Sequence, residues 1–463
     1  MVRRRGDASA SGTFMEVRGY RCASGLLRDC RGHGAGIGPG VGRDGAVGGP
    51  VACAAVGTHS DRRRRRPPGF GIIWSTVALD LVGFGIIIPV LPLYAEDFGA
   101  SPLMATSVLA TFSAAQMVAA PLWGRLSDRI GRKPVLIAAL VGSAVGSLVT
   151  GMAGVLWVLF LGRALDGASG SSYAVGQAAV ADLAEPEDRP RLLGLLAAAF
   201  GLGFVVGPLI GSLAALGGRA LPFFVAAGLA AVNAVVALVR LPSRPSTAVS
   251  DVGADGGDAV ATRRIGPIAA LGDAGAAMRR LALLALVGMM GFAGFESTFA
   301  LLLDRRFPQL DDPSVYGLFA SIGLVMVLVH TKVVGPANDR LGTRGALRAS
   351  LLLVAAGMFV LATGGAWIGL AVALLLLVVG QGLFGPTLSA ATVATVGTDA
   401  RGAALGLQQS AGALGRIVGP LVAGLLFGRV AIGAPYLVSG ALALVALLLV
   451  GRTADDEEAV TSR

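Results

Sequence analysis

The chain has 463 residues, of which 54% are hydrophobic and only 14% are charged, and its mean hydropathy is +0.73. This composition excludes a water-soluble globular protein and indicates that most of the chain lies in lipid. The net charge of +10 does not indicate nucleic-acid binding, because the Arg residues are dispersed among short segments between apolar runs. All three Cys residues lie within the first 53, which excludes a thiolate metal site from the apolar part; no metal site is expected.

Residues 1–69 form an Arg- and Gly-rich segment without apolar periodicity, and it ends in the basic run 62–66. We expect a disordered N-terminal tail here, because such a segment cannot bury enough apolar surface to fold. An over-long gene start would explain the same composition. The basic run directly precedes the first apolar segment, where it favours a cytoplasmic N-terminus.

Twelve apolar segments follow, each close to the 20 or so residues that a helix needs to cross roughly 30 Å of hydrocarbon. They predict a six-helix N-terminal bundle at 70–241, a cytoplasmic linker at 242–278, a six-helix C-terminal bundle at 279–451 and a tail at 452–463. The first six spans are expected near 70–93, 105–124, 134–153, 155–180, 192–214 and 220–240. The second six are expected near 279–303, 314–336, 345–365, 367–394, 402–427 and 431–451.

Basic residues are concentrated in every second predicted loop, as the positive-inside rule requires. They follow spans two, four and eight or lie in or beside the linker, at Arg125, Arg129, Arg132, Lys133, Arg189, Arg191, Arg240, Arg244, Arg263, Arg264, Arg279, Arg280, Arg340, Arg344 and Arg348. The alternate loops carry acidic residues, glycine or mixed charges. The pattern predicts a multi-pass protein of the inner (plasma) membrane with both termini in the cytoplasm.

Two motifs occur once in each half of the chain at nearly the same offset. The loop after span two carries Gly124, Asp128, Arg129, Gly131 and Arg132, and the loop after span eight carries Asp339 and Arg340, 211 residues later. Span five carries Gly203, Gly207, Pro208 and Gly211, and span eleven carries Gly415, Gly419 and Pro420, at an offset of 212. The two matches predict duplicated bundles related by an axis along the membrane normal.

These motifs resemble those of the major facilitator superfamily. The segment 124–133 is similar to the signature loop between spans two and three, and 79–92 is similar to the first-span motif of its drug:proton antiporters. Residues 161–167 resemble the span-four motif, and 203–211 resemble the span-five motif associated with antiport. Across residues 70–451, the chain therefore resembles the twelve-helix drug:proton antiporters, which include tetracycline efflux proteins.

The resemblance implies an all-α integral membrane protein with twelve transmembrane helices in two six-helix bundles related by pseudo-two-fold symmetry. The chain departs from the family pattern at two positions. Asp166 stands where the family usually has Gln, and Ser212 stands where it usually has a second Gly. The first departure bears on the residue that couples proton and substrate movement.

Asp80 lies about halfway along span one, where a carboxylate costs roughly 2.5–3.5 kcal/mol on insertion scales. Such a residue should face a polar cavity or a partner, and a group that binds either a proton or a cationic substrate is what an antiporter needs. The alternative is that Asp80 only positions span one through bonds to polar neighbours.

Three further charged residues are candidates for proton coupling or substrate binding. Arg163 and Asp166 are three residues apart in span four and can pair on one helix face. The resemblance implies that Arg163 tunes the proton affinity of a carboxylate, whereas a static structural pair is the alternative. Glu296, in the outer part of span seven, is expected to be less sheltered than Asp80 and either binds drug or proton or is solvated at the cavity mouth.

The remaining candidates concern gating, packing and the cavity wall. Asp128 and Arg132 lie at the cytoplasmic membrane surface, with Arg129 and Arg340 as further ion partners, and are interpreted as a gate that closes the inner face. The Gly-Pro pairs of spans five and eleven allow kinks and close helix crossings. Uncharged cavity candidates are Gln116, Gln177, Gln381 and Gln408, with Gln409 beside them.

We therefore predict a proton-coupled antiporter that exports amphipathic, drug-like compounds by alternating access, acting as a monomer. The energy source is the proton gradient, with no cofactor, no enzymatic activity and no nucleic-acid partner. A metabolite facilitator or proton symporter of the same fold is the first alternative, and a non-transporting sensor or scaffold is a remote one. A membrane enzyme would need a cluster such as paired His and Asp within the spans, and only one His lies there. No ATP-binding loop of the Gly-x-x-x-x-Gly-Lys-Ser/Thr type is present.

Overall fold

The computed structural model describes residues 15–17, 20–22, 67, 69–185, 188–241, 275–396 and 400–450. The chain divides into two units, Met1–Ser60 and Asp61–Arg463. In the first unit, strand β1 (Met15–Val17) pairs antiparallel with β2 (Tyr20–Cys22). The rest of the predicted N-terminal tail up to residue 66 lies outside the described residues, as do most of the predicted linker and all of the tail after residue 450.

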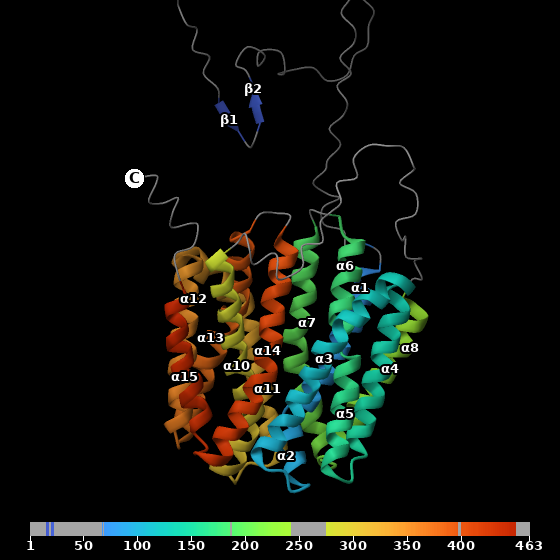
Figure 1. Ribbon diagram of the computed structural model, residues 1–463, viewed down its shortest axis with the longest axis vertical. Helices are drawn as coiled ribbons and strands as arrows, with labels where there is room; N and C mark the ends of the chain where they lie inside the picture. Colours follow the sequence, from blue (N-terminus) through green and yellow to red (C-terminus); the bar gives the residue numbers. More distant parts are fainter. Residues whose placement is uncertain are drawn as a thin grey trace, which may run out of the picture. The chain divides into compact units, whose positions relative to one another are not determined.

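Every secondary-structure element among the described residues of the second unit is a helix, which confirms the predicted all-α membrane fold (Figure 1). The helices of its first half are α1 (Phe70–Ile87), α2 (Leu91–Glu96), α3 (Pro102–Ile130), α4 (Arg132–Gly151), α5 (Leu156–Ser169), α6 (Ser172–Leu183), α7 (Arg189–Ala215) and α8 (Leu221–Arg240). The second half contains α10 (Gly275–Arg306), α11 (Asp312–Lys332), α12 (Val334–Thr363), α13 (Trp367–Ala394), α14 (Arg401–Arg429), α15 (Ala434–Ala446) and the 3₁₀ helix η3 (Leu447–Leu449).

Ten of the described helices are long and apolar enough to cross a membrane. The predicted fourth span is not one continuous helix, because it breaks into α5 and α6 at Gly170 and Ser171. The predicted first span is likewise divided into α1 and the short α2, next to Pro89 and Pro92, which lack a backbone donor. The predicted twelfth span is the shorter α15, extended by η3.

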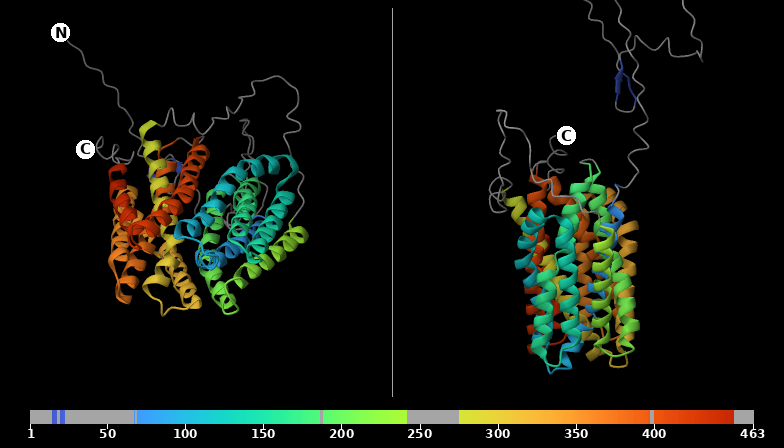
Figure 2. Two further views of the ribbon diagram at one scale, coloured as in Figure 1. Left: turned by 60° about the horizontal axis from the view of Figure 1, so that its bottom comes forward. Right: turned by 90° about the vertical axis from the view of Figure 1, so that its right-hand side faces the viewer.

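The two halves form separate bundles that lie side by side, with the blue-to-green helices on one side and the yellow-to-red helices on the other (Figures 1 and 2). The interface between the bundles consists mainly of α7 packed on α11 and α3 packed on α14. Close approach is possible there because small residues face the partner helix, as at Gly323 of α11, which lies against the Phe204 backbone of α7. We call the end of this unit that carries α2 and the α7–α8 loop the α2 end. The opposite end, where α8 ends and α10 begins, is called the linker end.

Each bundle contains the same glycine-dependent crossing. A Cβ added to Gly203 of α7 would lie 2.6 Å from the carbonyl oxygen of Leu81 in α1. A Cβ added to Gly415 of α14 would lie 2.6 Å from the carbonyl oxygen of Leu286 in α10. The equivalent contacts show that the repeated motif of spans five and eleven holds the same pair of helices together in both halves.

We expect Gly203→Leu to separate α1 from α7, because the new side chain would meet backbone atoms that cannot move aside. The cost should be about 1–3 kcal/mol or more, seen as a lower melting temperature of the purified protein in detergent. Gly194→Leu is the matched control on the same helix, since nothing lies within 4 Å of a Cβ at Gly194. Equal melting temperatures for the two variants would contradict the prediction.

Candidate functional site

A cavity of about 490 Å³ lies inside the second unit and is lined by helices from both bundles. Its wall is mainly apolar, with aromatic residues that include Phe84, Phe112, Phe204 and Phe292. Charged and amide groups enter it at a few points, at Asp80, Gln116, Asp166, Glu296, Gln409 and Arg416. A cavity of this size and polarity suits an amphipathic organic molecule. A sugar would need many polar groups around it, and a phosphate would need several basic side chains that converge on it.

Asp80 of α1 faces this cavity from the first bundle. The hydroxyl of Ser172, the first residue of α6, donates a hydrogen bond to its Oδ2 atom. The break between α5 and α6 therefore has a local consequence, because it presents a serine hydroxyl to the carboxylate. Asp80 thus has both a polar partner and access to the cavity.

Arg163 and Asp166 form the ion pair that their spacing in α5 predicts. Arg163 Nη1 lies 2.8 Å from Asp166 Oδ2, and the Arg163 side chain is only 1% exposed. The Ser143 hydroxyl donates to Asp166 Oδ1 at 2.6 Å, and Arg163 Nη2 donates to Thr150 Oγ1 at 3.4 Å. Asp166 lines the cavity, whereas Arg163 lies behind it.

Glu296 of α10 lines the cavity from the second bundle, together with Arg416 of α14. The expectation that Glu296 is less sheltered than Asp80 is wrong in this conformation, because both are half-buried and Glu296 Oε1 is inaccessible. Arg416 was not among the residues predicted from sequence to line the cavity. Its position is matched in the first half by Phe204, 212 residues earlier, which also lines the cavity, so the repeat could have indicated it.

The glutamines divide between different surroundings. Gln116 and Gln409 line the cavity, and the Gln116 amide donates to the Gly170 carbonyl at 2.5 Å. Gln381 instead lines a separate small cavity, and Gln408 donates to Ser389 Oγ at 3.1 Å. Gln177, Gln381 and Gln408 are not among the described residues that line the central cavity, so of the glutamine candidates the structure places Gln116, with the neighbouring Gln409, in its wall.

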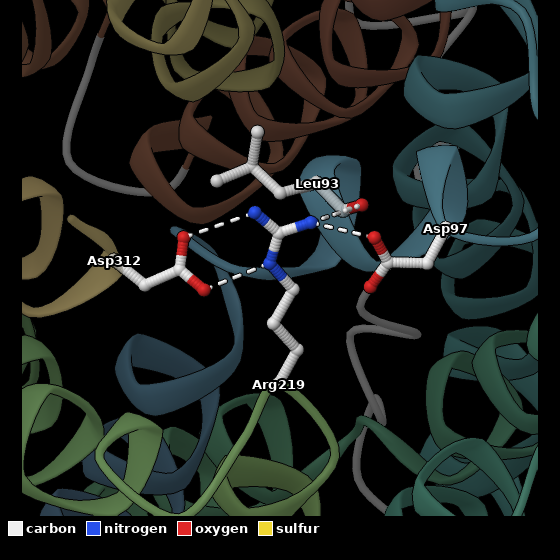
Figure 3. A network of polar contacts seen from close by, with 4 residues as sticks. All are labelled: Leu93, Asp97, Arg219 and Asp312. Carbon is white, nitrogen blue, oxygen red and sulfur yellow. Dashed lines mark hydrogen bonds and ion pairs between the residues drawn. The ribbon is translucent and has the colours of Figure 1, made fainter. Parts of the chain in front are cut away.

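Arg219, in the loop between α7 and α8, connects the two bundles at the α2 end (Figure 3). Its Nε and Nη2 atoms donate to the two carboxylate oxygens of Asp312 at 2.8 and 3.1 Å. Its Nη1 donates to Asp97 Oδ1 at 2.6 Å and to the Leu93 carbonyl at 3.5 Å. Because Asp312 begins α11, this arginine joins the first bundle to the second.

The hydrogen bond that Arg219 donates to Asp312 raises the pKa of the Arg219 guanidinium above its usual value, against a smaller opposing effect of burial. Arg219 therefore stays protonated at every physiological pH. Opening the α2 end must break the ion pair with Asp312 while Arg219 keeps its charge.

A second ion pair joins the bundles at the same end. Arg305, in the last turn of α10, donates through Nη2 to Glu96 Oε1 at 2.9 Å, and its guanidinium lies 5.0 Å from the centre of the Phe427 ring. Burial raises the pKa of the Glu96 carboxyl, and the positive charge of Arg305 opposes that shift. The two arginine contacts together close the α2 end by electrostatic attraction.

The predicted gating motif lies at the linker end, where its ion pairs join α4 to α3 and to α6. Arg132 Nη1 lies 2.7 Å from Asp128 Oδ1, and its Nε lies 2.9 Å from Asp182 Oδ2 of α6. Gly131 and its counterpart Gly342 both have positive φ, of 94° and 67°, where each loop turns into the next helix.

The other motif residues complete this end of the unit. Gly124 and Arg129 lie in the last turns of α3, and Asp339 and Arg340 are exposed near the start of α12. The repeated sequence motif therefore marks the same helix junction in both halves.

Comparison with known proteins adds to this geometry. The family model described as Major Facilitator Superfamily matches residues 73–334 and 312–463, which is most of the chain. The chain belongs to the Major Facilitator Superfamily. It is accordingly a multi-pass membrane protein and a secondary active transporter, in which the central cavity between the two bundles is the candidate substrate site.

Among curated members of the superfamily, the chain is 31% identical over 385 residues to the class C tetracycline resistance protein of Escherichia coli. That match covers 81% of this chain and 94% of the relative. A shorter match, 32% identical over 165 residues, relates it to multidrug resistance protein 1 of Bacillus subtilis (strain 168), and covers 35% of this chain and 42% of that protein.

Solved structures share the fold. The human organic anion transporter MFSD10 (TETRAN) matches with a TM-score of 0.63 at 24% identity, covering 83% of this chain and all of that one. A bacterial homolog of the human lysosomal transporter Spinster, solved in an inward-facing and unoccupied conformation, matches with a TM-score of 0.67 at 13% identity, covering 82% and 95%.

Proposed function

We propose that this protein is a proton-coupled antiporter that exports amphipathic, drug-like organic compounds by alternating access. The observation that carries the proposal is a membrane-embedded carboxylate, Asp80, on the wall of a largely apolar cavity between two bundles. A carboxylate there can bind a proton or a cationic compound, but not both stably, which couples the two movements in opposite directions. The relatives named for tetracycline and multidrug resistance support export rather than uptake.

In this proposal the linker end and both termini face the cytoplasm, and the α2 end faces outward. The basic residues of alternate loops support that orientation, since Arg125, Arg129, Arg132 and Lys133 lie at the linker end. The ion pairs of Arg219 and Arg305 then close the outer side, so the conformation faces the cytoplasm. The protein works as a monomer in the cell membrane, without a cofactor or a chemical reaction, and draws its energy from the proton gradient.

Asp80→Asn is expected to abolish the substrate-driven movement of protons out of the vesicles, because the amide cannot take up a proton. The measurement uses energised inside-out vesicles with a pH dye, to which tetracycline-like compounds and cationic dyes are added. Wild-type vesicles should lose part of their proton gradient on addition of a transported compound, and Asp80→Asn vesicles should not. Asp304→Asn, at an exposed acidic residue near the end of α10, is the matched control and should behave as wild type.

A different result would identify the runner-up function. If no compound changes the gradient while labelled compounds still equilibrate across the membrane, the protein is a facilitator and Asp80 has a structural role. If Asp80→Asn retains coupled export, another carboxylate carries the proton.

A further inference from the structure

Glu296 and Arg416 lie on neighbouring helices of the second bundle and face the same cavity, yet they do not bind each other. Glu296 Oε1 is buried and accepts no hydrogen bond. Within the described part of the chain, no ion pair of 4.0 Å or less includes either side chain. They are nevertheless close enough to interact electrostatically across the gap.

This arrangement leaves hydrogen-bonding capacity unused at a buried position. A buried acceptor without a partner costs about 1–3 kcal/mol, and the Arg416 guanidinium offers up to five donors beside it. The neighbouring cavity residues Met289 and Phe292 of α10 are apolar and cannot satisfy either group. A ligand that enters the cavity can bind the Arg416 guanidinium and the second carboxylate oxygen of Glu296, Oε2, which is not among the inaccessible atoms.

The charges decide which ligand group fits. A bare cation would be attracted by Glu296 but repelled by Arg416. A carboxylate on the ligand would be attracted by Arg416 but repelled by Glu296. A neutral group that donates to the Glu296 carboxylate and accepts from the Arg416 guanidinium satisfies both without adding a charge.

We propose that Glu296 and Arg416 form a specificity subsite that binds a neutral donor–acceptor group of the substrate, such as a primary carboxamide, while the apolar wall holds its aromatic body. The proposal deepens the proposed function, and it rests on that function only in taking the cavity as the substrate site. Asp80, on the opposite bundle, remains free for a positive charge on the same molecule.

Two matched probes test the subsite. 1-Benzyl-3-carbamoylquinolinium carries an aromatic body, a permanent positive charge and a carboxamide, and 1-benzyl-3-methylquinolinium has a methyl group in place of the carboxamide. Their dissociation constants are measured by equilibrium dialysis with the purified full-length protein in detergent. Glu296→Leu and Arg416→Met should each weaken binding of the carbamoyl probe about tenfold relative to the methyl probe, because the effect of the lost charge is common to both cations.

Gln408→Ala is the control variant on the same helix as Arg416, because Gln408 contacts Ser389 and does not line the cavity. It should leave both dissociation constants unchanged. Three outcomes overturn the proposal. The variants could weaken both probes equally, which makes the pair a structural feature; they could weaken neither; or the wild-type protein could fail to bind the carbamoyl probe.

Failure of the subsite and failure of the proposed function remain distinguishable. If the wild type discriminates between the probes as expected but the vesicle assay shows no proton-coupled export, the subsite stands and the antiport mechanism falls. If Asp80-dependent export is present but the variants treat both probes alike, antiport stands and the subsite falls.

Discussion

Arg163→Met is expected to lower the free energy of unfolding by about 3–5 kcal/mol, because it leaves the Asp166 carboxylate buried without its counter-ion. Asp166 would retain only the hydrogen bond from Ser143. Methionine fills a comparable volume, so the loss reports the charge rather than a cavity. The measurement is the midpoint of denaturant-induced unfolding of the purified protein in detergent, with Arg240→Met, at an exposed arginine at the end of α8, as control.

The double variant Arg163→Met/Asp166→Leu separates a structural role from a functional one. Replacing a buried ion pair by apolar residues is often nearly neutral, so the double variant should recover most of the stability lost in the single one. If it also recovers proton-coupled export, the pair is a static structural feature. Recovery of stability without recovery of export would assign the pair to coupling, in agreement with the position of Asp166 on the cavity wall. If Arg163→Met alone were as stable as the wild type, the predicted loss of stability would be contradicted.

Arg219→Gln is expected to shift the protein toward conformations that are open at the α2 end. The substitution removes the partly exposed ion pair with Asp312, which joins the two bundles and is worth about 0.2–1 kcal/mol, so the population ratio should change by up to about fivefold. Transport should slow, because the conformation closed at the α2 end becomes harder to reach. Spin labels are placed on α2 and on the first turn of α11, and the distance between them is measured by pulsed electron paramagnetic resonance. This distance should increase in the variant.

Arg429→Gln is the matched control for this experiment, because Arg429 is an exposed arginine at the α2 end, where it is the last residue of α14. Asp312→Asn should reproduce most of the shift, and it should have a smaller effect in the Arg219→Gln background than alone. Unchanged label distances in Arg219→Gln would show that helix packing, and not this network, holds the α2 end closed.

Much of the architecture could be predicted from sequence because lipid imposes a simple rule on it. A helix must satisfy its own backbone hydrogen bonds in the membrane, so each long apolar run predicts a helix of nearly the right bounds. This held for α4, predicted at 134–153 and observed at Arg132–Gly151, and for α13, predicted and observed at Trp367–Ala394. The helix breaks at Gly170 and near Pro89 were missed, because hydropathy stays high across them.

Pairs within one helix could also be predicted, since helical geometry fixes which side chains are neighbours. The spacing of Arg163 and Asp166 was sufficient to predict their ion pair, and the repeated motif was sufficient to predict equivalent crossings at Gly203 and Gly415. The rotation of a helix about its own axis is not fixed by such spacing. For that reason Gln116 and Gln408 could not be told apart in the sequence, although only the first lines the cavity.

The sequence by itself determined that this chain is a membrane protein of repeated helical halves, because apolar length and local glycine motifs act within single helices or between neighbouring ones. Only the tertiary structure decided which charges on different helices meet. Arg219 lies 122 residues from Asp97 and 93 from Asp312 along the chain, and Arg416 faces Glu296 from another helix. These partners depend on how the two bundles and their helices dock, and docking in lipid depends on the close fit of many small side chains rather than on any local pattern.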